Sequence, residues 1–230
     1  MNDAHPDTKL EIPFVGRWHY SRAEMIADGI VHAVGIVLAI AAGSTFLALA
    51  AFHSGPGEYV AAVFYVVSLL TVLSVSLAYN LWPVSWPAKW ILRRFDHAAI
   101  YLLIAATYTP FLAQLDNSPL ALPMIVIVWS AAAAGIAIKM FLPGRYDRLA
   151  IVFYLAIGWS GVVLAGPLVA TLPTTSVALL VAGGIVYSCG VVFFAWKGLR
   201  FHNAVWHGFV VAGAGFHLAA MVDCLVVNRF

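Results

Sequence analysis

The stretch GIVHAVGIVLAIAAGSTFLALAAF, residues 29–52, decides the fold, because it runs for 24 residues without an Asp, Glu, Lys or Arg. As an α-helix it would be about 36 Å long, which is enough to cross the roughly 30 Å hydrocarbon core of a bilayer. Six further apolar runs follow, at residues 59–81, 97–115, 120–142, 149–170, 176–196 and 204–227. The sequence therefore predicts an all-α, polytopic membrane protein built as a seven-transmembrane-helix bundle.

The positive charges fall in alternate gaps between these runs. Eleven of the twelve Lys and Arg residues lie before the first run or in every second gap: Lys9, Arg17, Arg22, Lys89, Arg93, Arg94, Lys139, Arg145, Arg148, Lys197 and Arg200. The gaps around Gly55, Asn117 and Thr174 carry none, and only Arg229 lies on the other side. By the positive-inside rule, we predict a multi-pass protein of the plasma (inner) membrane with its N-terminus in the cytoplasm and its C-terminus outside.

The composition leaves little room for a separate soluble domain. The chain is 63% hydrophobic and 10% charged, whereas soluble domains carry roughly 25% charged residues. We expect a cytoplasmic or interfacial segment at residues 1–28, of which residues 8–23 lie along the inner leaflet, and a seven-helix domain at residues 29–230. We expect no cleaved signal peptide. The expected partners are membrane lipids, and a net charge of +2 gives no indication of nucleic acid.

Polar side chains enter the apolar runs mainly at the ends predicted to be cytoplasmic. They are Glu24, Asp28 and His32 by the first run, Ser76 and Asn80 in the second, Asp96 before the third, and Asn203 and His207 by the seventh. Most are spaced four apart, and four residues turn a helix by only about 40°, so such pairs share a face. We expect one polar pocket near the inner leaflet if these helices are neighbours. The alternative is that each residue caps a helix or meets water.

Four other residues in the apolar runs have simpler interpretations. His217 lies about 15 Å beyond His207 along a helix, and we expect it to be a neutral histidine hydrogen-bonded between helices. Asp223 is expected near the outer end as a solvated or Tyr-paired carboxylate. Cys189 and Cys224 are expected to be small core residues.

Three strings carry a family resemblance: EMIADGIVHAVG (24–35), FDHAAIYLLIAATYTPF (95–111) and NAVWHGFVVAGAGFH (203–217). They resemble the hemolysin III proteins, part of the wider group that contains the progestin and adipoQ receptors. The resemblance implies a seven-helix bundle related to membrane-embedded hydrolases such as ceramidases. It also implies a zinc ion near the cytoplasmic leaflet, held by one His of the second span and two of the seventh, with an Asp of the third span helping to hold the metal-bound water.

Most residues of the expected pocket match this family pattern. The matching positions are Glu24 and His32 in the first span, with Asp28 where Asn is common, then Ser76, Asp96 and His207. The resemblance implies that Asp96 and Ser76 are the catalytic residues and that His207 is a metal ligand. Glu24, Asp28 and His32 would belong to the cofactor-binding surroundings.

Two positions depart from the pattern, because Asn80 and Asn203 stand where the family has zinc-binding histidines. A neutral amide oxygen is a poor substitute for the nitrogen, thiolate or carboxylate ligands of zinc, so zinc binding at this set would be weakened. Two alternatives remain open. The residues form a polar network without metal, or a metal site is relocated to His207 with Asp96, Asp28 or His32, which would also admit Mn or Mg.

The leading functional hypothesis is a metal-dependent lipid-amide hydrolase with a degraded zinc site. A water assisted by the metal or by Asp96 would attack the amide carbonyl, and Ser76 would donate a hydrogen bond to the developing oxyanion. The alternative is a non-enzymatic membrane sensor or regulator. Cytolysis through a pore, or proton transport, has less support, because the outer halves of the runs are almost wholly apolar.

Overall fold

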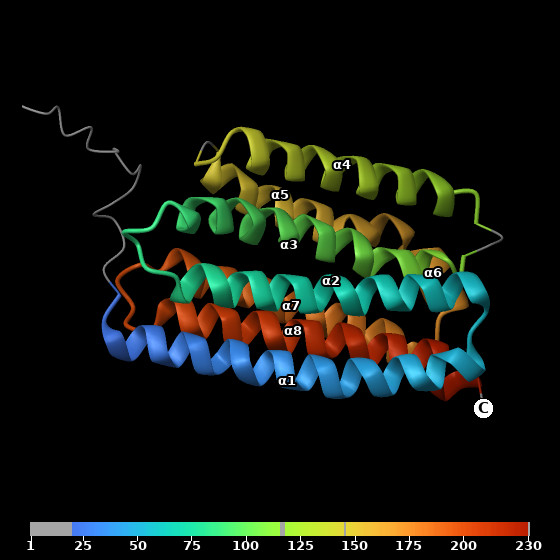
Figure 1. The fold of residues 1–230 in the computed structure, drawn as a ribbon. Helices are drawn as coiled ribbons and strands as arrows, with labels where there is room; N and C mark the ends of the chain where they lie inside the picture. The colour runs from blue at the N-terminus through green and yellow to red at the C-terminus, as the bar shows by residue number, and fades with distance from the viewer. Residues whose placement is uncertain (1–19, 116–117, 145, 230) are drawn as a thin grey trace, which may run out of the picture.

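The computed structural model describes residues 20–115, 118–144 and 146–229, and the regular elements within them are all helical (Figure 1). The α-helices are α1 (Arg22–His53), α2 (Pro56–Leu81), α3 (Ala88–Leu112), α4 (Ala121–Phe141), α5 (Asp147–Trp159), α6 (Ala165–Thr171), α7 (Thr174–Ala195) and α8 (His202–Leu225). Two 3-10 turns, η1 (Ser160–Leu164) and η2 (Val227–Arg229), complete the set. Residues 8–19 of the expected interfacial segment lie outside the described residues.

Six helical stretches are long and apolar enough to cross a membrane. They are Arg22–His53, Pro56–Leu81, Ala121–Phe141, Leu149–Thr171, Thr174–Ala195 and His202–Arg229. The helix α3 has 25 residues, enough length for a span, but it is not among the six and begins with charged residues such as Lys89 and Arg93. The protein is thus a multi-pass membrane protein, and each expected apolar run largely coincides with one helical stretch, although the third run continues past the end of α3 at Leu112.

Two helices begin well before the apolar runs that they contain. The first run starts at residue 29, but α1 starts at Arg22 because Ser21 and Glu24 form a reciprocal capping box. The Ser21 N–H donates to Glu24 Oε2 at 2.9 Å, and the Glu24 N–H donates to Ser21 Oγ at 3.3 Å. The helix α3 likewise starts at Ala88 rather than residue 97. Hydropathy locates the apolar stretch, whereas for α1 the capping box sets where the helix begins.

The fifth apolar run is a broken helix rather than one regular span. The α-helix ends at Trp159, passes through the 3-10 turn η1, and resumes as α6. Pro167 contributes to the break because proline has no N–H to donate to the preceding turn. The hydroxyl of Tyr108, from α3, fills the gap: it donates to Ile157 O at 2.8 Å and accepts from the Gly161 N–H at 2.7 Å.

The helices lie side by side along one common direction (Figure 1) and pack around two apolar cores. The larger core joins α1, α2 and α8 and includes Phe46, Tyr65 and Met221. The second lies where α3 meets α4 and α5 and includes Tyr101 and Val128. The helix α7 packs extensively on α8, whereas α5 makes few contacts with either α4 or α7. This sparse packing leaves space between α3, α5 and α7.

The helices α1, α3, α5 and α8 all begin at one end of the bundle (Figure 1), which we call the polar end. The first turns of these helices include Arg22, Lys89, Asp147 and His202. Here Lys139 Nζ donates to Asp147 Oδ1 at 2.7 Å, and Arg93 donates to Asp147 Oδ2. Arg93 and Lys139 are both buried. The ion cluster therefore ties α3, α4 and the start of α5 together.

A second ion pair holds the opposite end of the bundle. Arg229, the lone cation expected on this side, donates to Glu58 Oε1 at 2.6 Å and to Gln114 Oε1 at 2.7 Å. Gln114 also donates to Glu58 Oε1 at 2.8 Å. These bonds join the end of the described chain to the start of α2 and the residues just after α3.

Candidate functional site

A cavity of about 1630 Å³ extends from the polar end into the space between α2, α3, α5, α7 and α8. Ser76, Asp96 and His207 line its polar end, and apolar residues such as Leu168 and Leu180 line it farther along the bundle. The polar residues expected to form one pocket from four separate helices, apart from Asp28, thus line a shared space. The cavity joins this polar group to an apolar interior.

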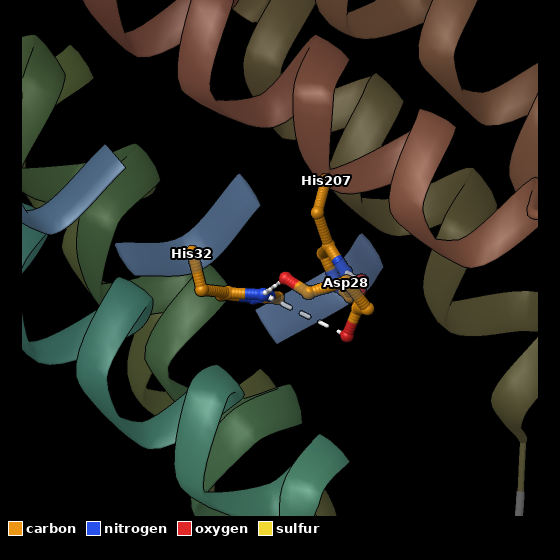
Figure 2. A group of neighbouring side chains, drawn as sticks. All are labelled: Asp28, His32 and His207. Carbon is orange, nitrogen blue, oxygen red and sulfur yellow. Dashed lines mark hydrogen bonds and ion pairs between the residues drawn. The ribbon is translucent and has the colours of Figure 1, made fainter. Parts of the chain in front are cut away.

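Three buried side chains meet beside the cavity: Asp28 and His32 from α1, and His207 from α8 (Figure 2). They are 2%, 1% and 9% exposed, respectively. One potential ligand atom from each lies within 4.8 Å of the other two. The ring centroids of the two histidines are 4.2 Å apart. We call this group the Asp28–His32–His207 trio.

The hydrogen bonds of the trio indicate where the imidazole hydrogens lie. His32 Nδ1 is 2.9 Å from the backbone oxygen of Asp28, and a carbonyl oxygen can only accept, so Nδ1 carries the hydrogen. His207 Nδ1 is 2.6 Å from Asp28 Oδ1, where the same reasoning applies to an ionised carboxylate. In both rings, if neutral, Nε2 then carries the lone pair.

Two polar atoms of the trio have no hydrogen-bond partner among the described residues: Asp28 Oδ2 and His32 Nε2. The nearest approach recorded for Asp28 Oδ2 is to His32 Nδ1, at 3.6 Å, which is too long for a hydrogen bond. Leaving a buried polar atom unsatisfied costs about 1–3 kcal/mol. Two such atoms in one cluster call for a further partner at this position.

Ser76, Asn80 and Asn203 form a hydrogen-bonded chain that begins at His207. Ser76 Oγ is 3.4 Å from His207 Nε2, and Asn80 Nδ2 donates to Ser76 Oγ at 3.2 Å and to the Ser76 backbone oxygen at 2.9 Å. Asn203 Nδ2 donates to Asn80 Oδ1 at 3.0 Å. The two asparagines thus bond to each other across α2 and α8 and orient the serine.

Asp96 and Glu24 take up different positions relative to this chain. Asp96 lines the cavity and interacts electrostatically with His207 and Ser76. Glu24 also borders the cavity, but its carboxylate is engaged in the α1 capping box and accepts from the Phe201 N–H at 3.1 Å. Glu24 therefore fixes the turn before α8 rather than joining the Asp28–His32–His207 trio.

The zinc positions implied by the family resemblance do not fit a metal in this chain. Two of the three are Asn80 and Asn203, whose amides are bonded to each other rather than offering anionic or nitrogen donors. Only His207 remains from that set, and catalytic zinc sites use three protein ligands. Asp28 and His32 approach His207 from the other side, from a helix that the implied set does not use.

The ion cluster at the polar end was not predicted from the sequence. Burial raises the pKa of the Asp147 carboxyl, but hydrogen bonds from Lys139 and Arg93 outweigh it and hold that pKa below its usual range. The sequence feature that could have predicted this cluster is Lys139, because it is a cation inside an apolar run and Asp147 follows eight residues later. Lys89 was also missed; its Nζ donates to the Trp82 carbonyl at 2.9 Å beside Asn80.

Hydrogen bonds resolve two further expectations, one for His217, which lines the apolar part of the cavity, and one for Asp223. His217 Nε2 lies 3.3 Å from the Leu180 carbonyl, so this histidine does bridge α8 and α7 as expected. Asp223 accepts from Ser176 Oγ at 2.6 Å rather than from a tyrosine. Neither residue belongs to the Asp28–His32–His207 trio.

Comparison with known proteins gives one consistent family. The model of the family described as "Haemolysin-III related" matches residues 21–218. The chain is 39% identical to the Hemolysin-3 homolog of Bacillus subtilis (strain 168) over 204 residues, covering 88% of this chain and 93% of that protein. It is 31% identical to the human monocyte to macrophage differentiation factor over 217 residues, covering 91% of this chain and 87% of that protein. No solved structure matches.

Proposed function

Because the chain belongs to the haemolysin-III-related family, we propose that it is a membrane-embedded hydrolase that cleaves an amide bond of an amphipathic lipid. In this proposal the protein crosses the plasma (inner) membrane seven times, with α3 as the span outside the six clearly apolar stretches. Its N-terminus is cytoplasmic, in line with the alternating positive charges. The polar end then lies at the inner leaflet, where a headgroup would reach it.

One observation carries this proposal: a single cavity joins the polar residues to a long apolar interior. Along α3 its lining runs from Lys89 to Leu112, about 35 Å of helix, which is long enough to span the roughly 30 Å hydrocarbon core of a bilayer. An acyl chain fits such a space, with the polar headgroup beside Ser76 and Asp96. The sparsely packed α5 provides the side from which lipid would enter.

The chemistry assigned to the site uses residues that face the cavity. Asp96, which lines the polar end of the cavity, would accept a proton from the attacking water and return it to the amide nitrogen as the C–N bond breaks and the amine leaves. Ser76 would donate a hydrogen bond to the oxygen of the amide carbonyl as negative charge develops there. Asn80 holds Ser76 in place through its 3.2 Å hydrogen bond to Oγ. No step is assigned to zinc at the family positions.

Fatty-acid release from a ceramide-like lipid by the purified protein in mixed micelles would test the proposal. We expect release by wild type and a loss of about 100-fold or more in Asp96→Asn, within the range that a general base contributes. Ser76→Ala should also lose activity, because it removes the hydrogen bond to the developing oxyanion. Ser74→Ala is its matched control, because Ser74 lies on the same helix but faces outward. Wild type that releases no fatty acid, or an Asp96→Asn variant as active as wild type, would refute the hydrolase.

A second candidate function, lipid binding without cleavage, is favoured by the Asn80–Asn203 hydrogen bond. That bond pairs the two side-chain amides with each other and supplies no charge to activate water. A protein of this kind would sense or regulate the membrane by binding lipid in the same cavity. Saturable binding of a ceramide-like lipid that is weakened by Asp96→Asn, together with no fatty-acid release, would support this function over hydrolysis.

A further inference from the structure

We propose that Ser76, activated by His207 and Asp28, is a nucleophile that cleaves the ester bond of an acyl lipid through a covalent acyl-serine. The three side chains come from α2, α8 and α1, and they form one line of contacts from the serine through the histidine to the carboxylate. The proposal goes beyond the amide hydrolysis above and shares only the cavity with it. There the Ser76 hydroxyl donates a hydrogen bond, whereas on an ester its oxygen would attack the acyl carbon.

The contacts have the order and the atoms of a nucleophile, its base and a residue that orients the base. Ser76 Oγ lies 3.4 Å from His207 Nε2, and His207 Nδ1 lies 2.6 Å from Asp28 Oδ1. Because the carboxylate accepts from the Nδ1–H, Nε2 carries the lone pair that can take the serine proton. The first distance exceeds the usual limit of about 3.2 Å, but contacts between a nucleophile and its base are often looser before substrate binds.

The base and its orienting carboxylate are held in place and shielded from water. His207 and Asp28 are both buried, and the ring of His32 packs on that of His207 with 4.2 Å between the centroids. The Asp28 carboxylate would stabilise the imidazolium that forms when Nε2 takes a proton. Asp28 is thus a positioning residue, whereas Ser76 and His207 would touch the substrate.

The hydroxyl of Ser76 is oriented differently from other hydroxyls inside these helices. Thr71, on the same helix, donates to the backbone oxygen four residues earlier at 2.8 Å, and Ser188 on α7 does the same at 2.8 Å. That bond is an ordinary one for a hydroxyl within a helix. Ser76 instead meets His207 from another helix, at the wall of the cavity. This orientation is the one that a nucleophile facing a bound lipid needs.

Asn80 provides a donor for the negative charge that develops on the carbonyl oxygen of the substrate. Its Nδ2 lies 3.2 Å from Ser76 Oγ, and Asn203 Nδ2 donates to Asn80 Oδ1 at 3.0 Å, which turns the N–H groups of Asn80 toward the serine. The backbone N–H groups around Ser76 are used by the helix itself. With a side-chain amide in place of a pair of backbone donors, we expect an ester, whose alcohol leaves more readily than an amine.

The proposed reaction has two stages, with the acyl chain in the apolar part of the cavity. Ser76 Oγ bonds to the acyl carbon and its proton passes to His207 Nε2; the bond to the alcohol oxygen then breaks, and the alcohol leaves with that proton. In the second stage a water molecule gives a proton to Nε2 and its oxygen bonds to the acyl carbon. The bond to Ser76 breaks, the fatty acid leaves and Oγ recovers the proton. Ester and water thus become acid and alcohol.

The test treats the full-length protein in detergent with a fluorophosphonate that carries a long alkyl chain, which bonds to an activated serine oxygen as fluoride leaves. Peptide mass spectrometry locates the adduct, and wild type is expected to carry it on Ser76. His207→Ala and Asp28→Asn should be labelled at least about 100-fold more slowly. Ser74→Ala and His202→Ala are matched controls expected to react like wild type, because Ser74 is exposed on α2 and His202 is a second buried histidine of α8.

Wild type that gains no adduct on Ser76 would overturn the proposal, and this measurement does not depend on how any variant folds. Labelling of His207→Ala at the wild-type rate would also overturn it, because the base would then be another group, such as Asp96. Since residues that act as a unit lose activity non-additively, the Asp28→Asn, His207→Ala double variant should react no more slowly than His207→Ala alone. Additive losses would overturn the role of Asp28.

The assays separate this proposal from the amide hydrolase. Release of fatty acid from a ceramide-like lipid by a wild type that forms no adduct on Ser76 would remove the serine nucleophile and leave the amide hydrolase standing. An adduct on Ser76, together with hydrolysis of p-nitrophenyl decanoate but no release from the ceramide-like lipid, would do the reverse.

Discussion

The ion cluster at the polar end gives the most direct test of how this bundle is stabilised. In Asp147→Asn, the carboxylate that accepts from Lys139 and Arg93 is replaced by a neutral amide of similar size. Removing one partner of a buried ion pair costs about 3–5 kcal/mol, whereas exposed pairs contribute about 0–1 kcal/mol. The Lys139 side chain is 3% exposed but that of Asp147 is 32% exposed, which places the expected cost at about 2–3 kcal/mol.

This cost converts to a measurable shift in apparent melting temperature. For a protein of 150–250 residues, each 1 kcal/mol lowers Tm by about 2–4 °C, so we expect Asp147→Asn to melt roughly 4–12 °C below wild type. The assay is thermal unfolding in one detergent at one scan rate, followed by circular dichroism. The double variant Asp147→Asn, Lys139→Met removes the stranded ammonium as well and should recover about half of the loss. A shift under about 2 °C in the single variant, or a double variant less stable than the single one, would refute the reasoning.

Three further predictions concern pH and packing. Folding lowers the pKa of Asp147, so the stabilisation that this carboxylate provides is complete above the unfolded pKa of about 3.9 and is lost as pH falls through the lower folded pKa. Asp147→Asn should therefore flatten the acid side of a plot of Tm against pH. Parallel plots for the variant and wild type would contradict this. Gly135→Leu should lower the free energy of unfolding by about 1–3 kcal/mol, because a Cβ at this position would lie 2.5 Å from the Tyr101 ring. Gly158→Ala is the control in the same melting assay, because a Cβ added at residue 158 has no neighbouring atom within 4 Å. Tyr108→Phe should lower the free energy of unfolding by about 1–3 kcal/mol, because it removes the hydroxyl at the break between α5 and α6. The Gly161 N–H donates to that hydroxyl at 2.7 Å, so hydrogen exchange of the Gly161 amide is the readout. Unchanged exchange would show that the turn does not need Tyr108.

Hydropathy predicted the helical stretches well, because crossing a membrane demands a long apolar run whatever the tertiary packing. The ends were less predictable. The start of α1 at Arg22 depends on the Ser21–Glu24 capping box, which lies in polar sequence before the run. The break after Trp159 was not predicted at all, because it depends on Tyr108, about fifty residues earlier in the chain.

The site was predictable in part, and the limit has a physical cause. Helical spacing of four placed Asp28 with His32 and Ser76 with Asn80 on shared faces, since those are local relations. The contact of Asp28 with His207 joins residues 179 positions apart, and only the packing of α1 on α8 decides it. The pairing of Asn80 with Asn203 is likewise a relation between helices, so the sequence left the relocated and metal-free alternatives open.

The broken fifth span has a consequence for how the bundle exchanges with its surroundings. Few side chains hold α5 against α7, and the turn between α5 and α6 is completed by a hydroxyl from another helix. Segments with few packed neighbours open at a lower free energy than the global unfolding of the protein. The segment formed by α5 and α6 is therefore expected to open before the rest of the bundle. Bilayer thickness and fluidity, acting on α5, would then set how often lipid enters the cavity.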